Sequence, residues 1–357
     1  MSGMVGGGAG AGRGGARRTS IADVARLAGV SQGTVSNVLN HPDRVTAATR
    51  ERVEDAIARL EFVPHGPARS LAAGAMRALG LILSDLTNSL FVDVSRGVER
   101  VAAEHGAFVL IANSDTDLAR ERQYLANFEA TQALATLVTI NDASHYRTLV
   151  AQHRTARPLV FLNYHGVSDA HCTVDMGNRE GGRLAARHLI GLGRRRLLVV
   201  GGPLELQPVA DRVAGFTEEA RAAGLDVMYD HVDELHRAQG WALGRRIAPR
   251  VLAGEVDGVF AVADLVAAGI AQALSATPGL TIPRDVGIVG YDDNRAAWDS
   301  PTPLTTIRQP GEELGATGAR IAFEEITDPT HVHRSITLDP ALVVRGSTVE
   351  AAGAGPV

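Results

Sequence analysis

The first regular pattern of apolar positions lies near the N-terminus, where three short stretches have helical spacing. Their apolar members are Ile21, Val24, Ala25 and Ala28, then Val35, Val38 and Leu39, and finally Val53, Ala56, Ile57 and Leu60. Ser20 followed by Asp23 is a helix-start signal, and Gly29 suits a helix end. Ser31 and Thr46 are suitable N-caps for the second and third helices. The pattern predicts three helices that share a small core.

The second of these stretches carries a polar face opposite its apolar stripe. That face holds Gln32, Gly33, Ser36, Asn37 and Asn40, none of which is acidic or bulky and apolar. Three helices with a small core and one exposed polar face are typical of a helix-turn-helix module, whose second helix enters the major groove of DNA. We therefore expect an all-α helix-turn-helix DNA-binding domain over residues 19–64.

From residue 77 the pattern changes to short apolar strands that alternate with helical stretches. The expected strands are 79–83, 108–112, 134–140, 159–162, 197–200, 227–232, 258–262 and 286–289. This alternation indicates parallel sheets covered by helices on both faces. It predicts an α/β domain of two doubly wound lobes over residues 77–346, like a periplasmic binding protein. A small ligand would bind in the cleft between the lobes, beyond the carboxyl ends of the strands.

Composition adds limits to this picture. The 357 residues carry a formal net charge of −5 and one cysteine, Cys172, so no internal disulfide can form and a reducing cytoplasm is the simplest setting. No apolar run is long enough to span a membrane. Residues 1–18 are expected to be a disordered Gly- and Ala-rich tail, residues 65–76 a hinge, and residues 347–357 a flexible tail. Arg17 and Arg18 lie just ahead of the first helix, where basic side chains could contact phosphates.

The run from Ile21 to Asn40 closely resembles the N-terminal signature of the lactose/galactose repressor family. Ala68-Arg69-Ser70-Leu71 matches a hinge motif of that family, and the likeness continues through phrases such as His188–Arg196 and Gly290–Asp293 to about residue 346. The resemblance implies a homodimer on a near-palindromic operator. It also implies that paired hinge helices push Leu71 into the minor groove, although composition alone favours a simple tether.

The resemblance also suggests roles for individual residues. Gln32, Gly33 and Asn37 occupy base-reading positions. The positions suited to phosphate contacts, or alternatively to helix capping and surface polarity, are Ser31, Thr34, Ser36 and Asn40. The effector-binding positions are Asn88, Phe91, Arg212, Trp241 and Asp292, with core packing as the alternative for Trp241. The family often has Asn-Asp where this chain has Ala263-Asp264, so one polar ligand contact is missing, which argues against a simple hexose.

Signals for other chemistry are weak. His331 and His333 lie two positions apart near an expected loop, which we interpret as surface, and we expect no metal and no cofactor. Gly29–Gly33 fits the Gly-x-Ser-x-Gly pattern, but a helix precedes it where a nucleophile elbow needs a strand. We therefore predict a DNA-binding transcriptional regulator, a repressor, controlled by a small polar effector such as a sugar or nucleoside. The alternatives are a solute-binding protein with the same two lobes and an enzyme on a doubly wound fold.

Overall fold

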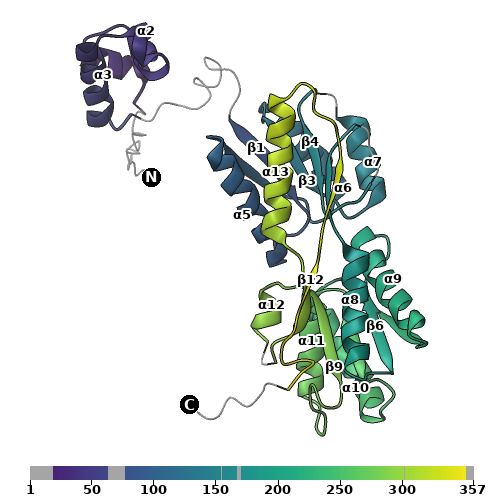
Figure 1. Cartoon of the computed structure of the whole chain (residues 1–357). Helices are drawn as coiled ribbons and strands as arrows, with labels where there is room; N and C mark the ends of the chain where they lie inside the picture. The colour runs from purple at the N-terminus through teal and green to yellow at the C-terminus, as the bar shows by residue number, and fades with distance from the viewer. Residues whose placement is uncertain (1–18, 63–76, 154, 167–169, 301, 351–357) are drawn as a thin grey trace, which may run out of the picture. The chain divides into compact units, whose positions relative to one another are not determined.

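The computed structural model describes residues 19–62, 77–153, 155–166, 170–300 and 302–350. The chain divides into two compact units, residues 1–75 and residues 76–357 (Figure 1). The expected N-terminal tail, the hinge with Leu71 and the last seven residues lie outside the described residues.

The N-terminal unit consists of α1 (Ile21–Ala28), α2 (Gln32–Asn40), a short 3₁₀ helix (Pro42–Arg44) and α3 (Ala47–Arg59). These helices surround one core, which comprises Val24, Ala25, Ala28, Val35, Val38, Val53, Ala56 and Phe62. All three helices begin within a residue of the positions that the apolar pattern predicts. The small three-helix core is therefore the one expected from the sequence.

The ends of α1 explain the tight turn into α2. Ser20 and Asp23 form a reciprocal capping box, in which the Ser20 side chain accepts from the Asp23 amide and Asp23 accepts from the Ser20 amide at 3.0 Å. Gly29 ends the helix in the left-handed region at φ 66°, which costs glycine little. Thr46 occupies the N-cap of α3, but its side chain makes no capping hydrogen bond.

The larger unit contains, among its described residues, two six-stranded sheets. In the first sheet the order is β11-β5-β4-β3-β1-β2, and in the second it is β12-β10-β9-β8-β6-β7. The first sheet holds β1 (Ala78–Leu83), β2 (Phe108–Asn113), β3 (Ala135–Thr139), β4 (Leu159–Leu162), β5 (Thr173–Met176) and β11 (Ser335–Leu338). The second sheet holds β6 (Leu197–Gly201), β7 (Val227–His231), β8 (Gly258–Ala261), β9 (Gly287–Asp292), β10 (Thr305–Arg308) and β12 (Ala341–Val343). All the pairings are parallel except the one between β10 and β12.

Helices cover both faces of each sheet (Figure 1). The first lobe, built on the first sheet, has α5 (Ser89–Glu104) and α13 (Gly311–Thr327) on one face and α6 (Leu118–Ala130) and α7 (Ala143–Gln152) on the other. The second lobe has α10 (Arg237–Leu252) and α11 (Asp264–Ser275) on one face and α8 (Asn178–Gly191) and α9 (Gln207–Ala222) on the other. The short α12 (Arg295–Trp298) joins the first of these two faces.

Glycines allow the helices that cover a face to approach closely. A Cβ added to Gly97 on α5 would overlap the backbone carbonyl of Glu312 on α13, and one added to Gly315 would overlap that of Val94. The two glycines therefore form a reciprocal contact between the backbones of α5 and α13. This contact holds α13 against α5 in the first lobe, although α13 follows β10 of the second sheet along the chain.

The chain passes between the lobes three times, after β5, after β10 and between β11 and β12. Each lobe is thus assembled from segments that are distant in sequence. The two lobes and their parallel sheets agree with the sequence prediction, and β5, β10, β11 and β12 are additional short strands that it did not identify. Along the described part of the chain, no helix has the length and apolarity needed to span a bilayer.

The prediction that a flexible tail begins at residue 347 is wrong for its first two residues. Ser347 is fully buried, and its hydroxyl donates to the carbonyl of Ile288 at 2.6 Å and accepts from the amide of Thr305 at 2.8 Å. Thr348 is also buried and bonds with Thr305. These polar side chains are held by hydrogen bonds to β9 and β10, a tertiary effect that a local reading of polarity misses.

Candidate functional site

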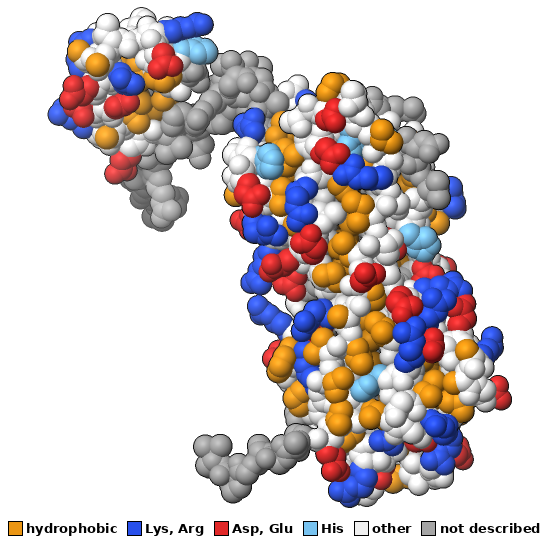
Figure 2. Space-filling view, in the orientation of Figure 1, with side chains coloured by type: hydrophobic (Ala, Val, Ile, Leu, Met, Phe, Trp, Pro, Cys, Tyr) orange, Lys and Arg blue, Asp and Glu red, His pale blue; other side chains and the backbone are white. Residues whose placement is uncertain are grey.

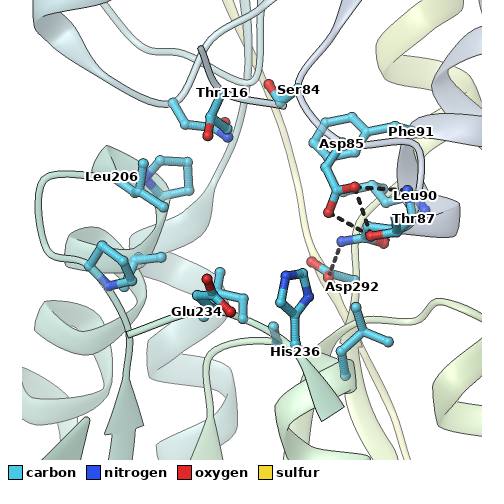
Figure 3. Close-up of a pocket in the computed structure, with 18 of the residues that line it drawn as sticks. Ser84, Asp85, Thr87, Leu90, Phe91, Thr116, Leu206, Glu234, His236 and Asp292 are labelled. Carbon is cyan, nitrogen blue, oxygen red and sulfur yellow. Dashed lines mark hydrogen bonds between the residues drawn. The ribbon is translucent and has the colours of Figure 1, made fainter. Parts of the chain in front are cut away.

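A cavity of about 510 Å³ lies between the two lobes, at the carboxyl ends of strands from both sheets (Figure 3). From the first lobe it is lined by residues that follow β1, β2, β3 and β4, and from the second by residues that follow β6, β7 and β8 or end β9. Parallel strands place their carboxyl ends at one edge of a sheet, where doubly wound folds bind ligands. The lining residues used below are Asp85, Asn88, Phe91, Asp115, Asn141, Asn163, Leu206, Arg212, Asp233, Glu234, His236, Ala263 and Asp292.

Asn88 connects the two lobes at one side of this cavity. It is the N-cap of α5, and its side-chain oxygen accepts from the Leu90 amide at 3.0 Å. Its Nδ2 donates to Oδ2 of Asp292 in the second lobe at 3.0 Å, and Asn294 donates back to the Asn88 oxygen at 3.1 Å. One side chain therefore caps a helix of the first lobe and bonds to two residues of the second.

Arg212 lies on α9 and is only 5% exposed. Its Nε donates to Oδ1 of Asn178 at 2.8 Å, and its Nη1 donates to the carbonyl of Val262 at 2.8 Å. The same Nη1 lies 3.5 Å from Oδ1 of Asp292, and the guanidinium stacks 3.8 Å from the ring centroid of Tyr291. Its charge is therefore paired within the protein and its orientation is fixed by these contacts.

Asp292 is the matching acceptor at the end of β9. It is 4% exposed and accepts from Asn88 and, at 2.6 Å, from Nε2 of Gln309. Burial raises the pKa of the Asp292 carboxyl, while the Arg212 charge and the two hydrogen bonds lower it. Next to it, burial and the Asp292 charge raise the pKa of the fully buried Asp264 well above the usual range. The site thus concentrates acidic groups at one point between the lobes.

The lining as a whole is rich in acids. Glu234 and His236, from the loop after β7, face Asp85 and Thr87 of the opposite lobe across the cavity (Figure 3). Asn163, at the end of β4, is 4% exposed and donates to Asn141 at 2.7 Å, but its own oxygen accepts no hydrogen bond from the described residues. A buried acceptor without a donor is costly to leave unpaired.

Four of the five sequence-predicted effector residues, Asn88, Phe91, Arg212 and Asp292, line this one cavity. The fifth, Trp241, is half-buried on α10 and is not among the lining residues. His236, the N-cap of α10, reaches the cavity. Side chains five positions apart on a helix point in directions that differ by about 140°. Trp241, five positions after His236, therefore points in a different direction from it. The sequence did not identify Asn141, Asn163, Glu234 or His236, although each follows a predicted strand.

The polar face of α2 is accessible in the N-terminal unit. Gln32, Gly33 and Asn37 are exposed, and Ser36 is half-buried. The Ser31 hydroxyl caps α2, accepting from the Thr34 amide at 3.1 Å, and lies 2.9 Å from the Thr34 hydroxyl. Ser31 therefore caps α2, and phosphate contacts by Ser31 and Thr34 stay a prediction. Asn40 is the last residue of α2, and Leu71 lies outside the described residues.

The interpretation of His331 and His333 as a plain surface loop is wrong for His331, whose side chain is 3% exposed. Its Nε2 lies 3.2 Å from Sγ of the buried Cys172. The 159 positions between these residues hide their proximity in the sequence. This cluster lies in the first lobe and is considered separately below.

A helix-turn-helix unit followed by a two-lobed unit with a polar cleft defines the class of DNA-binding regulators that respond to small molecules. The family model described as bacterial regulatory proteins, lacI family, matches residues 20–65, and the periplasmic binding protein-like domain matches residues 186–348. The chain belongs to the lacI family of bacterial regulatory proteins. It is thus a DNA-binding transcriptional regulator and not an enzyme.

Relatives resemble the chain over nearly its whole length. It is 31% identical over 330 residues to the ribose operon repressor of Escherichia coli (strain K12), covering 92% of this chain and 99% of that protein. It is 30% identical over 333 residues to the HTH-type transcriptional repressor PurR of Aliivibrio fischeri (strain ATCC 700601 / ES114), covering 92% of this chain and 98% of that protein.

Two solved structures have the same architecture. The Lac repressor dimer bound to operator and the anti-inducer ONPF matches with a TM-score of 0.79 and 25% identity, covering 93% of this chain and all of that one. A complex of the transcriptional regulator CelR with cellobiose matches with a TM-score of 0.66 and 30% identity, covering 92% of this chain and all of that one. The helix-turn-helix and two-lobed fold predicted from the sequence is thereby confirmed.

Proposed function

We propose that this chain is a cytoplasmic repressor that binds a near-palindromic operator as a homodimer. We further propose that a neutral sugar in the cavity between the lobes controls its affinity for DNA. The repressors among its relatives support the first part, and the relatives named for ribose and bound to cellobiose support the second. The alternative of a solute-binding protein gives no role to the exposed polar face of α2.

The observation that carries the ligand class is the charge of the cavity. Its lining includes the acids Asp85, Asp115, Asp233, Glu234 and Asp292. The basic groups among the described lining residues are Arg212 and His236, and Arg212 is already paired with Asp292. An anionic ligand would meet net negative charge and no free guanidinium. A neutral ligand with many hydroxyl groups can donate to these carboxylates without that repulsion.

The remaining lining fits such a ligand. The amide side chains of Asn141 and Asn163 supply polar groups that suit hydroxyls, while Leu206 supplies apolar surface for the C–H face of a ring. Ala263 lines the cavity where relatives often have asparagine, so this side offers no polar side chain. Cavities of a few hundred cubic ångströms hold ligands of this size.

A nucleoside, the other effector class predicted from the sequence, fits less well. Bases are commonly held by stacking on aromatic side chains. Among the described lining residues, the ring-bearing side chains other than proline are Phe91 and His236. Phe91 is 6% exposed, which leaves little of its face for a base. The cavity therefore favours a sugar over a nucleoside.

The edge strand β2 supports the homodimer. It is the outermost strand of the first sheet, and its side chains are almost all apolar. Phe108 and Ile111 are each 50% exposed. Exposed apolar edge strands are commonly covered by another chain. Elsewhere, acidic and basic side chains are interspersed over the visible face of the two lobes (Figure 2). Covering β2 by a second copy would bring two recognition helices to one operator.

The ligand proposal is tested by thermal shift of the full-length protein against matched panels. Ribose, xylose, glucose and cellobiose form the neutral panel, and their phosphorylated forms and free nucleosides form the others. A ligand that binds only the folded state raises the melting temperature, and the shift grows with the ratio of ligand concentration to Kd. We expect a shift from at least one neutral sugar and none from its phosphorylated form. Shifts confined to phosphorylated sugars or nucleosides would contradict the proposed ligand class.

The DNA part is tested by selecting bound duplexes from a random pool. One recognition helix reads only a few base pairs, so a homodimer should return inverted half-sites with a fixed spacing. Recovery of single, unpaired half-sites would contradict the homodimer.

A further inference from the structure

The amino ends of β5 and β11 carry a second cluster of chemically active side chains. Cys172 immediately precedes β5, His331 and His333 lie between α13 and β11, and Glu325 lies near the end of α13. One donor atom from each of these four residues lies within 4.8 Å of the other three. Because the cavity between the lobes lies at the carboxyl ends of the strands, this cluster is at the opposite edge of the first sheet.

We propose that Cys172, Glu325, His331 and His333 form a binding site for a divalent transition metal of the zinc class. Thiolate, imidazole and carboxylate are the donors that zinc takes in proteins, in sets of four with tetrahedral geometry. A single cysteine beside two histidines and a glutamate gives that set within a compact volume.

The spacing of the donor atoms fits one central ion. Cys172 Sγ lies 3.2 Å from His331 Nε2 and 3.8 Å from His333 Nδ1. Glu325 Oε2 lies 3.9 Å from each of the same two nitrogens. Zinc–sulfur and zinc–nitrogen bonds at tetrahedral angles give donor separations of roughly 3.3 to 3.6 Å. These four separations lie within about half an ångström of that range, and the other two are below 4.8 Å.

The carboxylate of Glu325 is the clearest sign of a ligand in the structure. Its Oε2 is buried and accepts no hydrogen bond from the part of the chain that the structure describes. A buried carboxylate oxygen without a donor is unfavourable. Two histidine nitrogens lie 3.9 Å from this oxygen, and both are proposed metal ligands. A cation bound among them would satisfy this oxygen.

Groups around the cluster orient these donors. Nδ1 of His331 lies 3.2 Å from Glu324, so a proton held there leaves the Nε2 lone pair facing Cys172 and Glu325. Arg334 holds Glu324 through two hydrogen bonds at 2.8 and 2.6 Å. The backbone amide of Arg334 also donates to Cys172 Sγ at 3.4 Å, which suits a thiolate. Carboxylates that position a ligating histidine in this way are common at zinc sites.

A metal here would connect segments that are distant in the chain. Cys172 belongs to the run that enters β5, whereas the other three residues lie in the last segment of the first lobe, from the end of α13 to the start of β11. The bound ion would fix this late segment, which returns from the second lobe, to the strand beside it in the sheet.

Cobalt titration of the full-length protein tests the site most directly, after chelator treatment and removal of any affinity tag. Because Cys172 is the only cysteine, a thiolate-to-cobalt charge-transfer band can come from this residue alone. We expect that band at one cobalt per chain, together with the visible bands of tetrahedral cobalt, and its displacement by zinc. Absence of the charge-transfer band in the folded protein would overturn the proposal.

Single substitutions distinguish the proposed metal ligands from residues that only orient them. Cys172→Ser should abolish the charge-transfer band, and His333→Ala should weaken zinc binding measured against a chromophoric chelator. Glu324→Gln should keep the band but lower metal affinity by roughly 10- to 100-fold, as expected for a group that orients a ligand. His231→Ala is the matched control, because that histidine pairs with Asp233 in the second lobe at 3.0 Å and should bind metal no differently from the parent.

Circular dichroism and thermal melting establish that each variant is folded. If Cys172→Ser does not fold, the decision rests on Glu324→Gln and His333→Ala, whose altered side chains are 41% and 24% exposed in the parent. Zinc affinities of these two variants equal to that of the parent, or a loss in His231→Ala as large as theirs, would overturn the assignment.

Discussion

Asn88 donates a hydrogen bond of 3.0 Å to Asp292, a residue 204 positions away on the opposite lobe. The same carboxylate lies 3.5 Å from Arg212, so one acidic group serves both the contact between the lobes and the buried cation of the cavity. A ligand that bonds with Asn88, Asp292 or Arg212 would alter the contacts that these three residues make with one another. We therefore expect ligand binding in the cavity to change the relative stability of different arrangements of the two lobes.

The first prediction concerns Asn88→Asp. The new side chain keeps an oxygen to cap α5 but replaces the amide donor with a second carboxylate facing Asp292, which is 4% exposed. Like charges in a poorly solvated position repel strongly. We expect the lobes of the ligand-free variant to separate, with a larger radius of gyration in small-angle X-ray scattering. Asn88→Ser, which caps without repulsion, should change it less. Scattering curves of Asn88→Asp and the parent that superimpose would contradict this coupling.

The second prediction concerns the buried pair Arg212 and Asp292. Arg212→Met should lower the free energy of unfolding by about 3–5 kcal/mol, because Asp292 is left buried without its cation. Asp292→Leu should be similarly costly, whereas the double variant should cost less than the sum by roughly 1–3 kcal/mol. Urea unfolding of all four proteins gives this coupling. The exposed pair Arg187 and Glu180, at 2.8 Å, is the control and should show about 0–1 kcal/mol. Additive effects at Arg212 and Asp292 would be inconsistent with the pair described here.

The third prediction concerns the pH dependence of stability at Asp175. Burial raises the pKa of this carboxyl to about 6, against the opposing effect of His165. A raised pKa means that the folded state binds the proton more tightly than the unfolded chain does. The contribution of the group is therefore fully present below its unfolded pKa of about 4 and is lost as the pH rises through 6.

Asp175→Asn cannot ionise, so it lacks this loss. Relative to the variant, the parent should become less stable by about 2–3 kcal/mol between pH 4 and pH 7, measured by denaturant unfolding. A constant difference between the two proteins over this range would show that the pKa of Asp175 is not raised.

The fourth prediction concerns the exposed face of α2. Asparagine suits adenine in the major groove, so Asn37→Ala should relax the preference at one operator position at a cost of about 1–3 kcal/mol. Ser31→Ala should instead lower the stability of the N-terminal unit by about 0.5–2 kcal/mol, because it removes the cap of α2. Competition between duplexes with single base changes distinguishes the two. Unchanged base preferences in Asn37→Ala would exclude a base-reading role.

Long or strongly apolar elements could be predicted from the sequence, and short polar ones could not. Residues 159–162 were assigned as a strand with the observed bounds, because four apolar residues there are buried on both faces. Thr173–Met176 was missed, since two of its four side chains, Thr173 and Asp175, are polar. Both are nevertheless buried, Thr173 through a hydrogen bond of 2.6 Å to Ser335 on β11. Such a strand is stabilised by its neighbour in the sheet, which local sequence does not show.

Part of the cavity lining could be predicted from the sequence, either from the family resemblance or from the pattern of strands. Four residues assigned from the resemblance, Asn88, Phe91, Arg212 and Asp292, line one cavity, whereas Trp241, whose direction depends on where α10 begins, does not line it. Asn141 and Asn163 could have been found from the rule that ligands meet the carboxyl ends of parallel strands. The cluster of Cys172 with Glu325, His331 and His333 had no local signal, because its members join only through the parallel pairing of β5 and β11.

The most direct test of the proposed function asks whether a ligand in the cavity changes the affinity of the protein for its operator. Binding of the full-length protein to a selected operator duplex is measured by fluorescence anisotropy, with increasing amounts of the neutral sugar that gives the largest thermal shift. Typical coupling energies of 1–3 kcal/mol predict a change in DNA affinity of roughly 5- to 150-fold, and the phosphorylated form of the same sugar should have no effect. A sugar that saturates the cavity while leaving operator affinity unchanged would contradict the proposed control of DNA binding.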